Sequence, residues 1–229
     1  MKKNKTTKNT ASQFSLVELL AIITILCILA VLMLPAASGT VNRAKLTACS
    51  NHLRQIGTAT GSYTIDNMGF IPNIMPELED SSIPIIRLPN GTLLALGRLF
   101  SGGYIVDIKN FGCHASPGCE PEEIARNFRT TPMLWIAYLY RSQDYGFDPI
   151  LSSEINQDRA YLTDFACVTA EGRNFAPHGY LFSNILFTDG HTECRENSPV
   201  PFEKFTIQAS RHNENTPDCT TVWRHTDKK

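Results

Sequence analysis

Histidines, an acid and a cysteine that could bind metal lie close together near residue 190. His178 precedes the dipeptide Asp189-Gly190, and His191 and Cys194 follow it. Imidazole, carboxylate and thiolate are all competent ligands for a transition metal. Their spacing fits no tight ligand motif, and neighbouring residues of a strand point to opposite faces. We therefore expect a structural turn and no resident metal here, and His178, Asp189 and His191 are the candidate ligands should an ion bind.

Cysteines beyond residue 34 could form disulfides. In an exported domain they would pair, whereas in a cytosolic domain they would be free thiols or metal ligands. Cys113 and Cys119 enclose the turn-forming Pro117-Gly118, which favours a small disulfide-closed loop. A redox role is disfavoured because the spacing is not Cys-x-x-Cys. The candidate disulfide residues are Cys49, Cys113, Cys119, Cys167, Cys194 and Cys219.

Other chemistry has little support in the sequence. Calcium is the one cofactor considered, and its candidate ligands lack the regular spacing of a calcium loop. They are Asp144, Asp148, Glu154 and Asp158. No nucleophile motif or phosphate-binding glycine loop occurs, so we expect no enzyme. The net charge of −1 includes no concentrated basic face, so we expect no nucleic-acid partner.

Residues 14–34 form an apolar run with a single charge, Glu18. About 20 apolar residues cross a bilayer, so the run predicts a transmembrane helix in contact with lipid. The charged residues ahead of Phe14 are all lysines, which places the N-terminus in the cytoplasm and the remaining chain outside. An ordinary signal peptide has a shorter apolar region. Neither that interpretation nor an ordinary signal anchor explains Glu18, because a carboxylate within a bilayer is costly and usually functional.

Cleavage between Gln13 and Phe14 would give Glu18 a partner. The new α-amino group would lie one helical turn from the carboxylate of the same chain. In a filament, the amino group of one subunit could instead pair with Glu18 of its neighbour, because an unpaired buried charge is unfavourable. We therefore hypothesise that Glu18 acts in assembly.

The run FSLVELL, from Phe14 to Leu20, resembles the cleavage and methylation motif of type IV prepilins and type II secretion pseudopilins. The resemblance implies a prepilin peptidase that cuts before Phe14 and methylates it. It also implies assembly with other pilin-like subunits. Pro35 falls where many of these proteins kink their helix, because proline removes a backbone donor. Gln13 occupies the position before the cleaved bond, where the family usually has Gly.

Two further segments resemble a subgroup of this family. CSNHLRQIG, from Cys49 to Gly57, looks like the stretch that follows the membrane helix. The resemblance implies that Cys49 is structural and could form a disulfide with Cys113 or another cysteine of the head. His178 followed by Asp189-Gly190 looks like the C-terminal signature of the subgroup, with a gap one residue longer than usual.

A long helix and several strands must position these residues. An apolar stripe continues the helix beyond Pro35 and ends near Asp66-Asn67 and Gly69. The stripe comprises Leu46, Cys49, Leu53, Ile56, Thr60 and Tyr63. Residues 92–100 could form a short helix, and residues 134–140, 161–168 and 180–188 favour strands. Asp189-Gly190 predicts a type I′ hairpin turn.

These observations predict an α+β fold in which a long N-terminal transmembrane helix continues as the spine of a pilin-like head with a small antiparallel sheet. The expected parts are a basic leader (1–13), a transmembrane helix (14–34), a helical spine (35–68) and a head with a polar tail (69–229). The expected location is the bacterial inner membrane, single-pass, with the head periplasmic or extracellular. We expect a structural subunit of a type IV pilus or secretion pseudopilus. The alternative is a membrane-tethered module that binds a polymer or carbohydrate at the surface.

Overall fold

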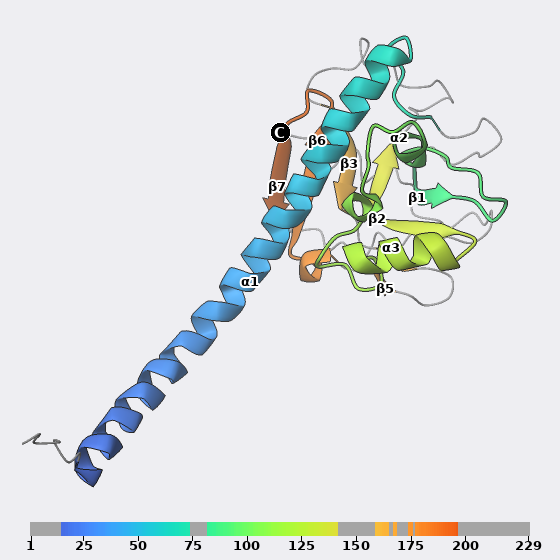
Figure 1. Cartoon of the computed structure of the whole chain (residues 1–229). Helices are drawn as coiled ribbons and strands as arrows, with labels where there is room; N and C mark the ends of the chain where they lie inside the picture. The colour runs from blue at the N-terminus through green and yellow to red at the C-terminus, as the bar shows by residue number, and fades with distance from the viewer. Residues whose placement is uncertain are drawn as a thin grey trace, which may run out of the picture. The chain divides into compact units, whose positions relative to one another are not determined.

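The computed structural model describes residues 15–73, 82–141, 159–164, 167–168, 174–175 and 177–196. The chain divides into two compact units, residues 1–41 and 42–229. Helix α1, Leu16–Asp66, runs through the boundary between them. The described part of the first unit is helical, and the second unit holds the rest of α1 and all the strands among the described residues (Figure 1).

An antiparallel five-stranded sheet is the centre of the second unit, with strand order β1-β2-β3-β6-β7. The strands are β1 (Ser82–Arg87), β2 (Leu134–Arg141), β3 (Ala160–Asp164), β6 (Phe182–Phe187) and β7 (Thr192–Glu196). A separate pair consists of β4 (Cys167–Val168) and β5 (Asn174–Phe175). The remaining helices are α2 (Gly97–Ser101), α3 (Pro121–Thr130) and the 3-10 helices η1 (Ile108–Phe111) and η2 (Pro177–Tyr180).

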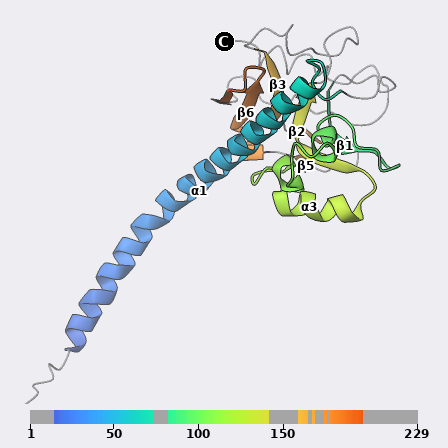
Figure 2. The same cartoon turned by 45° about the horizontal axis from the view of Figure 1, so that its top comes forward.

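The C-terminal part of α1 packs beside β3 and β6, as Figure 1 and Figure 2 both show. Cys49, Leu53 and Ile56 on this helix are fully buried. They follow one another at intervals of four and three residues, which places them on one helical face. The predicted apolar stripe is therefore confirmed. The helix ends at Asp66, followed by Gly69 with φ of +87°.

The predicted transmembrane helix over residues 14–34 is wrong. No helix in the described parts of the chain is both long and apolar enough to cross a membrane. The structure agrees with the predicted α+β class, long N-terminal helix and antiparallel sheet, but not with a transmembrane spine. The predictions of a single-pass membrane protein and of a type II secretion pseudopilin, which depended on that spine, are therefore withdrawn.

The predicted hairpin at Asp189-Gly190 joins β6 to β7, but its turn differs from the expected type I′. The Phe187 backbone N–H donates to the carbonyl of His191, at 3.0 Å. The Gly190 N–H donates to the Phe187 carbonyl, at 2.9 Å. Only Gly190 of this dipeptide has positive φ, +87°, whereas type I′ requires it at both central residues. The connection is thus a longer loop that ends in a left-handed glycine.

Other elements differ in how well sequence patterns predicted them. The strand expected over residues 134–140 is confirmed as β2, and residues 180–188 contain β6. The expected strand over 161–168 is divided between β3 and β4, and the helix expected over 92–100 occupies only Gly97–Ser101. Strand β1 and helix α3 were not predicted. The start of α3 carries a recognisable signal, because Pro121 is followed by two glutamates.

Gly97 of α2 lies against the backbone of Ile86 in β1, and we expect Gly97→Ala to destabilise the fold by about 2 kcal/mol. A Cβ atom at this position would lie 2.3 Å from the carbonyl oxygen of Ile86. That oxygen also accepts a hydrogen bond from the Leu94 backbone N–H, at 3.1 Å, and so resists displacement. Urea unfolding of the purified chain measures the loss.

Gly61 offers the matched control for this prediction. It lies within α1, and a Cβ atom there would meet nothing within 4 Å. Gly61→Ala should stabilise the chain by about 0.5 to 1 kcal/mol, because alanine favours the helix interior. Equal effects of the two substitutions on the free energy of unfolding would show that the Ile86 carbonyl does not exclude a larger side chain at position 97.

Candidate functional site

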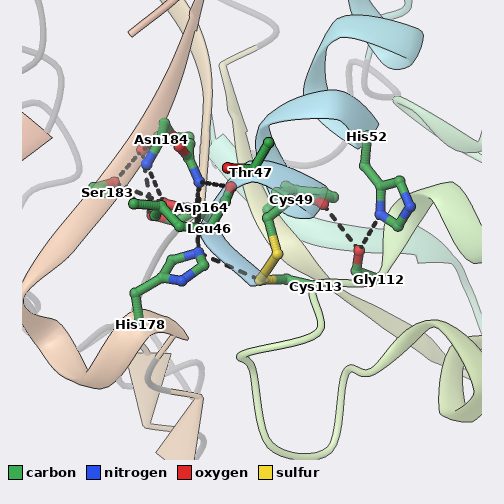
Figure 3. Close-up of polar contacts among 12 residues, drawn as sticks. Leu46, Thr47, Cys49, His52, Gly112, Cys113, Asp164, His178, Ser183 and Asn184 are labelled. Carbon is green, nitrogen blue, oxygen red and sulfur yellow. Dashed lines mark hydrogen bonds and ion pairs between the residues drawn. A yellow bond between two sulfur atoms is a disulfide. The ribbon is translucent and has the colours of Figure 1, made fainter. Parts of the chain in front are cut away.

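Four buried polar side chains gather near the end of β3 and the start of β6 (Figure 3). We call them the polar cluster: Asp164, His178, Ser183 and Asn184. Strands β3 and β6 pair antiparallel, and their register brings Asp164, the last residue of β3, beside Ser183 and Asn184. The fourth member, His178, comes from η2, directly before β6. The sheet thus sets the positions of three members, and a short 3-10 turn supplies the fourth.

Asp164 is the acceptor at the centre of the polar cluster and is only 1% exposed. Its Oδ1 accepts from the Asn184 backbone N–H at 2.6 Å and from the Ser183 hydroxyl at 2.9 Å. Its Oδ2 lies 2.7 Å from Asn184 Nδ2 and 3.0 Å from His178 Nε2. A buried carboxylate is tolerated only when such donors replace its water. Both oxygens of Asp164 are therefore satisfied from within the fold.

His178 directs one ring nitrogen, Nε2, toward both Asp164 and the disulfide. Its side chain is 4% exposed, and Nε2 lies 3.6 Å from Cys113 Sγ. The residue has φ of +55°, a left-handed conformation that histidine enters more readily than most side chains. Such backbone geometry persists only where the surroundings hold it. The contact with Asp164 is one such restraint, because it fixes the imidazole in the buried position.

The disulfide joins Cys49 of α1 to Cys113, which follows η1. The two Cα atoms are 5.2 Å apart, within the usual range for such bonds. Both residues are fully buried. The bond closes a loop with a sequence separation of 64, so it fastens α1 to the segment that leads into α3.

Gly112, directly before Cys113, provides a second connection to α1. Its carbonyl oxygen accepts hydrogen bonds from Tyr138 Oη at 2.9 Å and from His52 Nδ1 at 2.8 Å, so His52 carries a proton on Nδ1. Burial, followed by the negative charge of Asp164, raises the pKa of Tyr138 well above its usual range. The Tyr138 hydroxyl therefore stays a neutral donor. These bonds fix the backbone from which the Cys113 side chain projects.

The geometry does not form a thiol–imidazole–carboxylate relay, although a cysteine, a histidine and an aspartate lie together, because the Cys113 sulfur is bonded to Cys49. Such a relay uses one ring nitrogen of histidine for the thiol and the other for the carboxylate. Here His178 Nε2 faces both Cys113 and Asp164. The ligand atoms of Cys49, Cys113 and His178 lie within 4.8 Å of one another, and within the described residues they are the one group of three that could hold a metal ion.

The predicted processing residues Gln13 and Phe14 lie outside the described residues. Glu18 is in the first turn of α1, and its Oε2 accepts from the Ser15 backbone N–H at 3.0 Å. The Ser15 hydroxyl in turn accepts from the Val17 N–H at 3.4 Å. This arrangement approximates a capping box, which the pattern Ser-x-x-Glu could have indicated. Pro35 lies within α1, which continues through it.

The structure does not bring together the expected signature residues His178 and Asp189. Instead Asp189 Oδ1 accepts from the His191 backbone N–H at 3.0 Å and lies close to the His191 ring. Burial opposes ionisation of Asp189, but these contacts with His191 lower its pKa overall. The candidate metal set of His178, Asp189 and His191 is therefore divided between a buried cluster and an exposed turn.

The other cysteines have different environments. Cys113 pairs with Cys49, so the expected disulfide between Cys113 and Cys119 does not form. Backbone hydrogen bonds hold that loop, including the Cys113 N–H to the Cys119 carbonyl at 3.0 Å. Cys194 is an exposed free thiol, and partial burial followed by the charge of Asp164 raises its pKa. Cys219, the Cys167 side chain and the calcium candidates at residues 144–158 lie outside the described parts.

Asp164, Ser183 and Asn184 were not predicted as site residues. Each interrupts a strand-like sequence with a polar side chain, and all three are buried. A buried polar residue points to a specific structural or functional role more strongly than a buried apolar residue does. The pattern alone did not show burial, because strands with one solvated face also alternate in this way.

Comparisons of the chain with protein-family models, with curated proteins and with solved structures find no significant match. The resemblance to type IV pilins therefore depends on the motif residues and on the properties of α1.

Proposed function

We propose that the chain is a pilin-like structural subunit whose N-terminal helix packs against neighbouring subunits in a filament. The observation that carries the proposal is the apolar surface of α1 between Leu16 and Val31. Its large apolar side chains are between 46% and 80% exposed. The only charge in this stretch is Glu18. A continuous apolar surface of this kind marks an interaction site, because monomeric proteins rarely expose one.

The start of α1 supports this proposal. The motif resemblance predicts cleavage before Phe14, and Ser15 and Glu18 cap a helix that begins at Leu16. A cleaved subunit would therefore begin almost directly with a capped helix. Such a helix presents its apolar side chains to a neighbour without a preceding charged leader. The partners proposed for this segment are a prepilin peptidase and other pilin-like subunits.

The C-terminal part of α1 explains how such a subunit would carry its head. Leu53 and Ile56 are fully buried in the core of the second unit. The Cys49–Cys113 disulfide adds a covalent link. The same helix therefore serves the head through one part and offers an uncovered apolar surface in the other.

Ile25→Asp tests the packing of α1 directly. Ile25 is 57% exposed, so the substitution leaves the core of the head unchanged. We expect at least a roughly tenfold loss of assembled filament, because a buried isoleucine contributes about 1.5 to 3 kcal/mol. The chain is co-expressed with a prepilin peptidase and the sheared filament fraction is quantified. Mass spectrometry of that fraction should find methylated Phe14 at the N-terminus.

Val106→Asp is the matched control, since Val106 belongs to the head and is 88% exposed. It should assemble like the unmodified chain. Equal assembly of both variants, or filaments that retain Met1, would contradict the proposed function.

Glu18→Gln separates the charge of Glu18 from its capping role. Glutamine also accepts at this position of a capping box, so the bond to the Ser15 N–H is retained. We expect cleavage to continue and assembly to fall several-fold, because the α-amino group of the neighbouring subunit loses its carboxylate partner. Immunoblots of processed and filament-bound protein measure the two steps separately. Normal assembly of the variant would exclude intersubunit charge pairing.

A further inference from the structure

We propose that Cys49, Cys113 and His178 form a zinc site when the disulfide between the two cysteines is reduced. The proposal concerns the head and does not depend on filament assembly. In the structure the three ligand atoms already lie within 4.8 Å of one another. Two thiolates and one imidazole are a ligand set that favours zinc over calcium or magnesium, which prefer oxygen.

The distances fit tetrahedral coordination with a small rearrangement. Zinc bonds of about 2.0 Å to nitrogen and 2.3 Å to sulfur place two such ligands roughly 3.6 Å apart. Cys113 Sγ and His178 Nε2 are 3.6 Å apart in the structure (Figure 3). The sulfurs of Cys49 and Cys113 would have to separate to about 3.8 Å once their bond is broken. Rotation of the two side chains could supply this movement, because the cysteines lie on separate elements, α1 and the segment after η1.

The chemistry requires a two-electron reductant, and in a cell this would be a thiol or dithiol. Two electrons from the reductant break the Cys49–Cys113 bond, and the reductant becomes a disulfide. Each sulfur takes a proton to become a thiol. Zinc binding then releases these two protons, because thiolates are the ligands. Imidazole binds through Nε2, so the proton that Nε2 donates to Asp164 in the oxidised chain leaves that nitrogen and the neutral ring carries its proton on Nδ1. Oxidation by a disulfide reverses the sequence and releases the ion.

The polar cluster can accommodate the change at His178. When Nε2 turns to the metal, Asp164 loses that contact. It keeps three donors: the Asn184 backbone N–H, Asn184 Nδ2 and the Ser183 hydroxyl. No buried carboxylate is left without partners, which would be unfavourable. The two thiolates also balance the charge of a divalent ion. The three protein ligands leave the fourth coordination position to water.

The site would therefore link α1 to the segment after η1 in both redox states. A disulfide makes the link under oxidising conditions, and zinc makes it under reducing conditions. This exchange of disulfide for zinc gives a role to the imidazole of His178 beside the two sulfurs, since the disulfide itself does not require an imidazole.

Cobalt binding tests the proposal on the full chain in mild detergent, which covers the apolar part of α1. The protein is reduced with a phosphine in the absence of oxygen and titrated with Co²⁺. We expect one Co²⁺ per chain, a thiolate-to-cobalt charge-transfer band and displacement by Zn²⁺. The oxidised chain should show no such band. Absence of the band from the reduced chain would overturn the proposal.

Variants identify the ligands. His178→Ala should weaken Zn²⁺ binding by at least about tenfold. Cys194→Ser should leave binding unchanged, because Cys194 is exposed and outside the site. The fold of His178→Ala is checked first in the oxidised state by circular dichroism. Unchanged zinc affinity in a folded His178→Ala chain would overturn the assignment of His178.

Alkylation of the unmodified chain tests the site without any variant. Iodoacetamide reaches the buried Cys49 and Cys113 of the reduced protein only when the head opens transiently, and Zn²⁺ should slow this alkylation, as mapped by peptide mass spectrometry. Cys194 should react whether or not zinc is present. Protection that maps to other cysteines would overturn the proposal.

Discussion

Replacing Asp164 by alanine is expected to lower the free energy of unfolding by about 3 to 5 kcal/mol, the usual range when one partner of a buried ion pair or network is removed. The carboxylate is 1% exposed and accepts from His178, Ser183 and Asn184. Alanine would deprive the Asn184 backbone N–H and His178 Nε2 of the carboxylate, whereas Ser183 Oγ keeps the Asp164 carbonyl and Asn184 Nδ2 keeps the Leu46 carbonyl as acceptors. Each unsatisfied buried group costs about 1 to 3 kcal/mol. Urea unfolding, followed by circular dichroism, measures the loss.

Asp189→Ala provides the matched control, because it removes the same carboxylate from an exposed turn. The Asp189 carboxylate contacts His191, and this pair is solvent-accessible. Exposed pairs contribute about 0 to 1 kcal/mol. A loss below about 1 kcal/mol for Asp164→Ala as well would show that the polar cluster does not stabilise the head.

The contrast between Asp164 and Asp189 shows which part of the site could be predicted. Sequence patterns identified Asp189-Gly190 as a turn because the signal is local. The partner of His178 is not local. It is Asp164, which approaches only because β3 pairs with β6. A pairing register of this kind depends on the whole sheet, and the spacing of His178 and Asp189 in sequence could not reveal it.

The fold shows the same difference between local patterns, which the sequence reveals, and strand pairing, which it does not. The stripe on α1 predicted the buried face correctly, because helical periodicity repeats over several turns. Strand β2 was recognisable from its aromatic and β-branched residues. Strand β1 was not predicted, and its pairing with β2 is irregular. Apolar content suggested a membrane span over residues 14–34, but apolar content alone does not distinguish lipid contact from packing against other helices.

Loss of the Cys49–Cys113 disulfide is expected to lower the free energy of unfolding by about 4 kcal/mol, from the chain entropy of a loop with this separation. The Cys49→Ala/Cys113→Ala chain removes the bond without leaving thiols, and urea unfolding without reductant measures the effect. Cys194→Ala is the control and should change stability little, because this cysteine is exposed and free.

Zinc separates the roles of the two cysteines in the same experiment. If they also bind metal when reduced, Zn²⁺ should restore much of the stability lost on reduction of the unmodified chain, since a ligand that binds only the folded state stabilises it. The alanine double variant should not respond, because it lacks both thiolates. Equal stabilisation of the two proteins by Zn²⁺ would show that the ion binds elsewhere. If the double variant is as stable as the unmodified oxidised chain, the disulfide is not needed, and the hydrogen bonds at Gly112 suffice to hold this segment against α1.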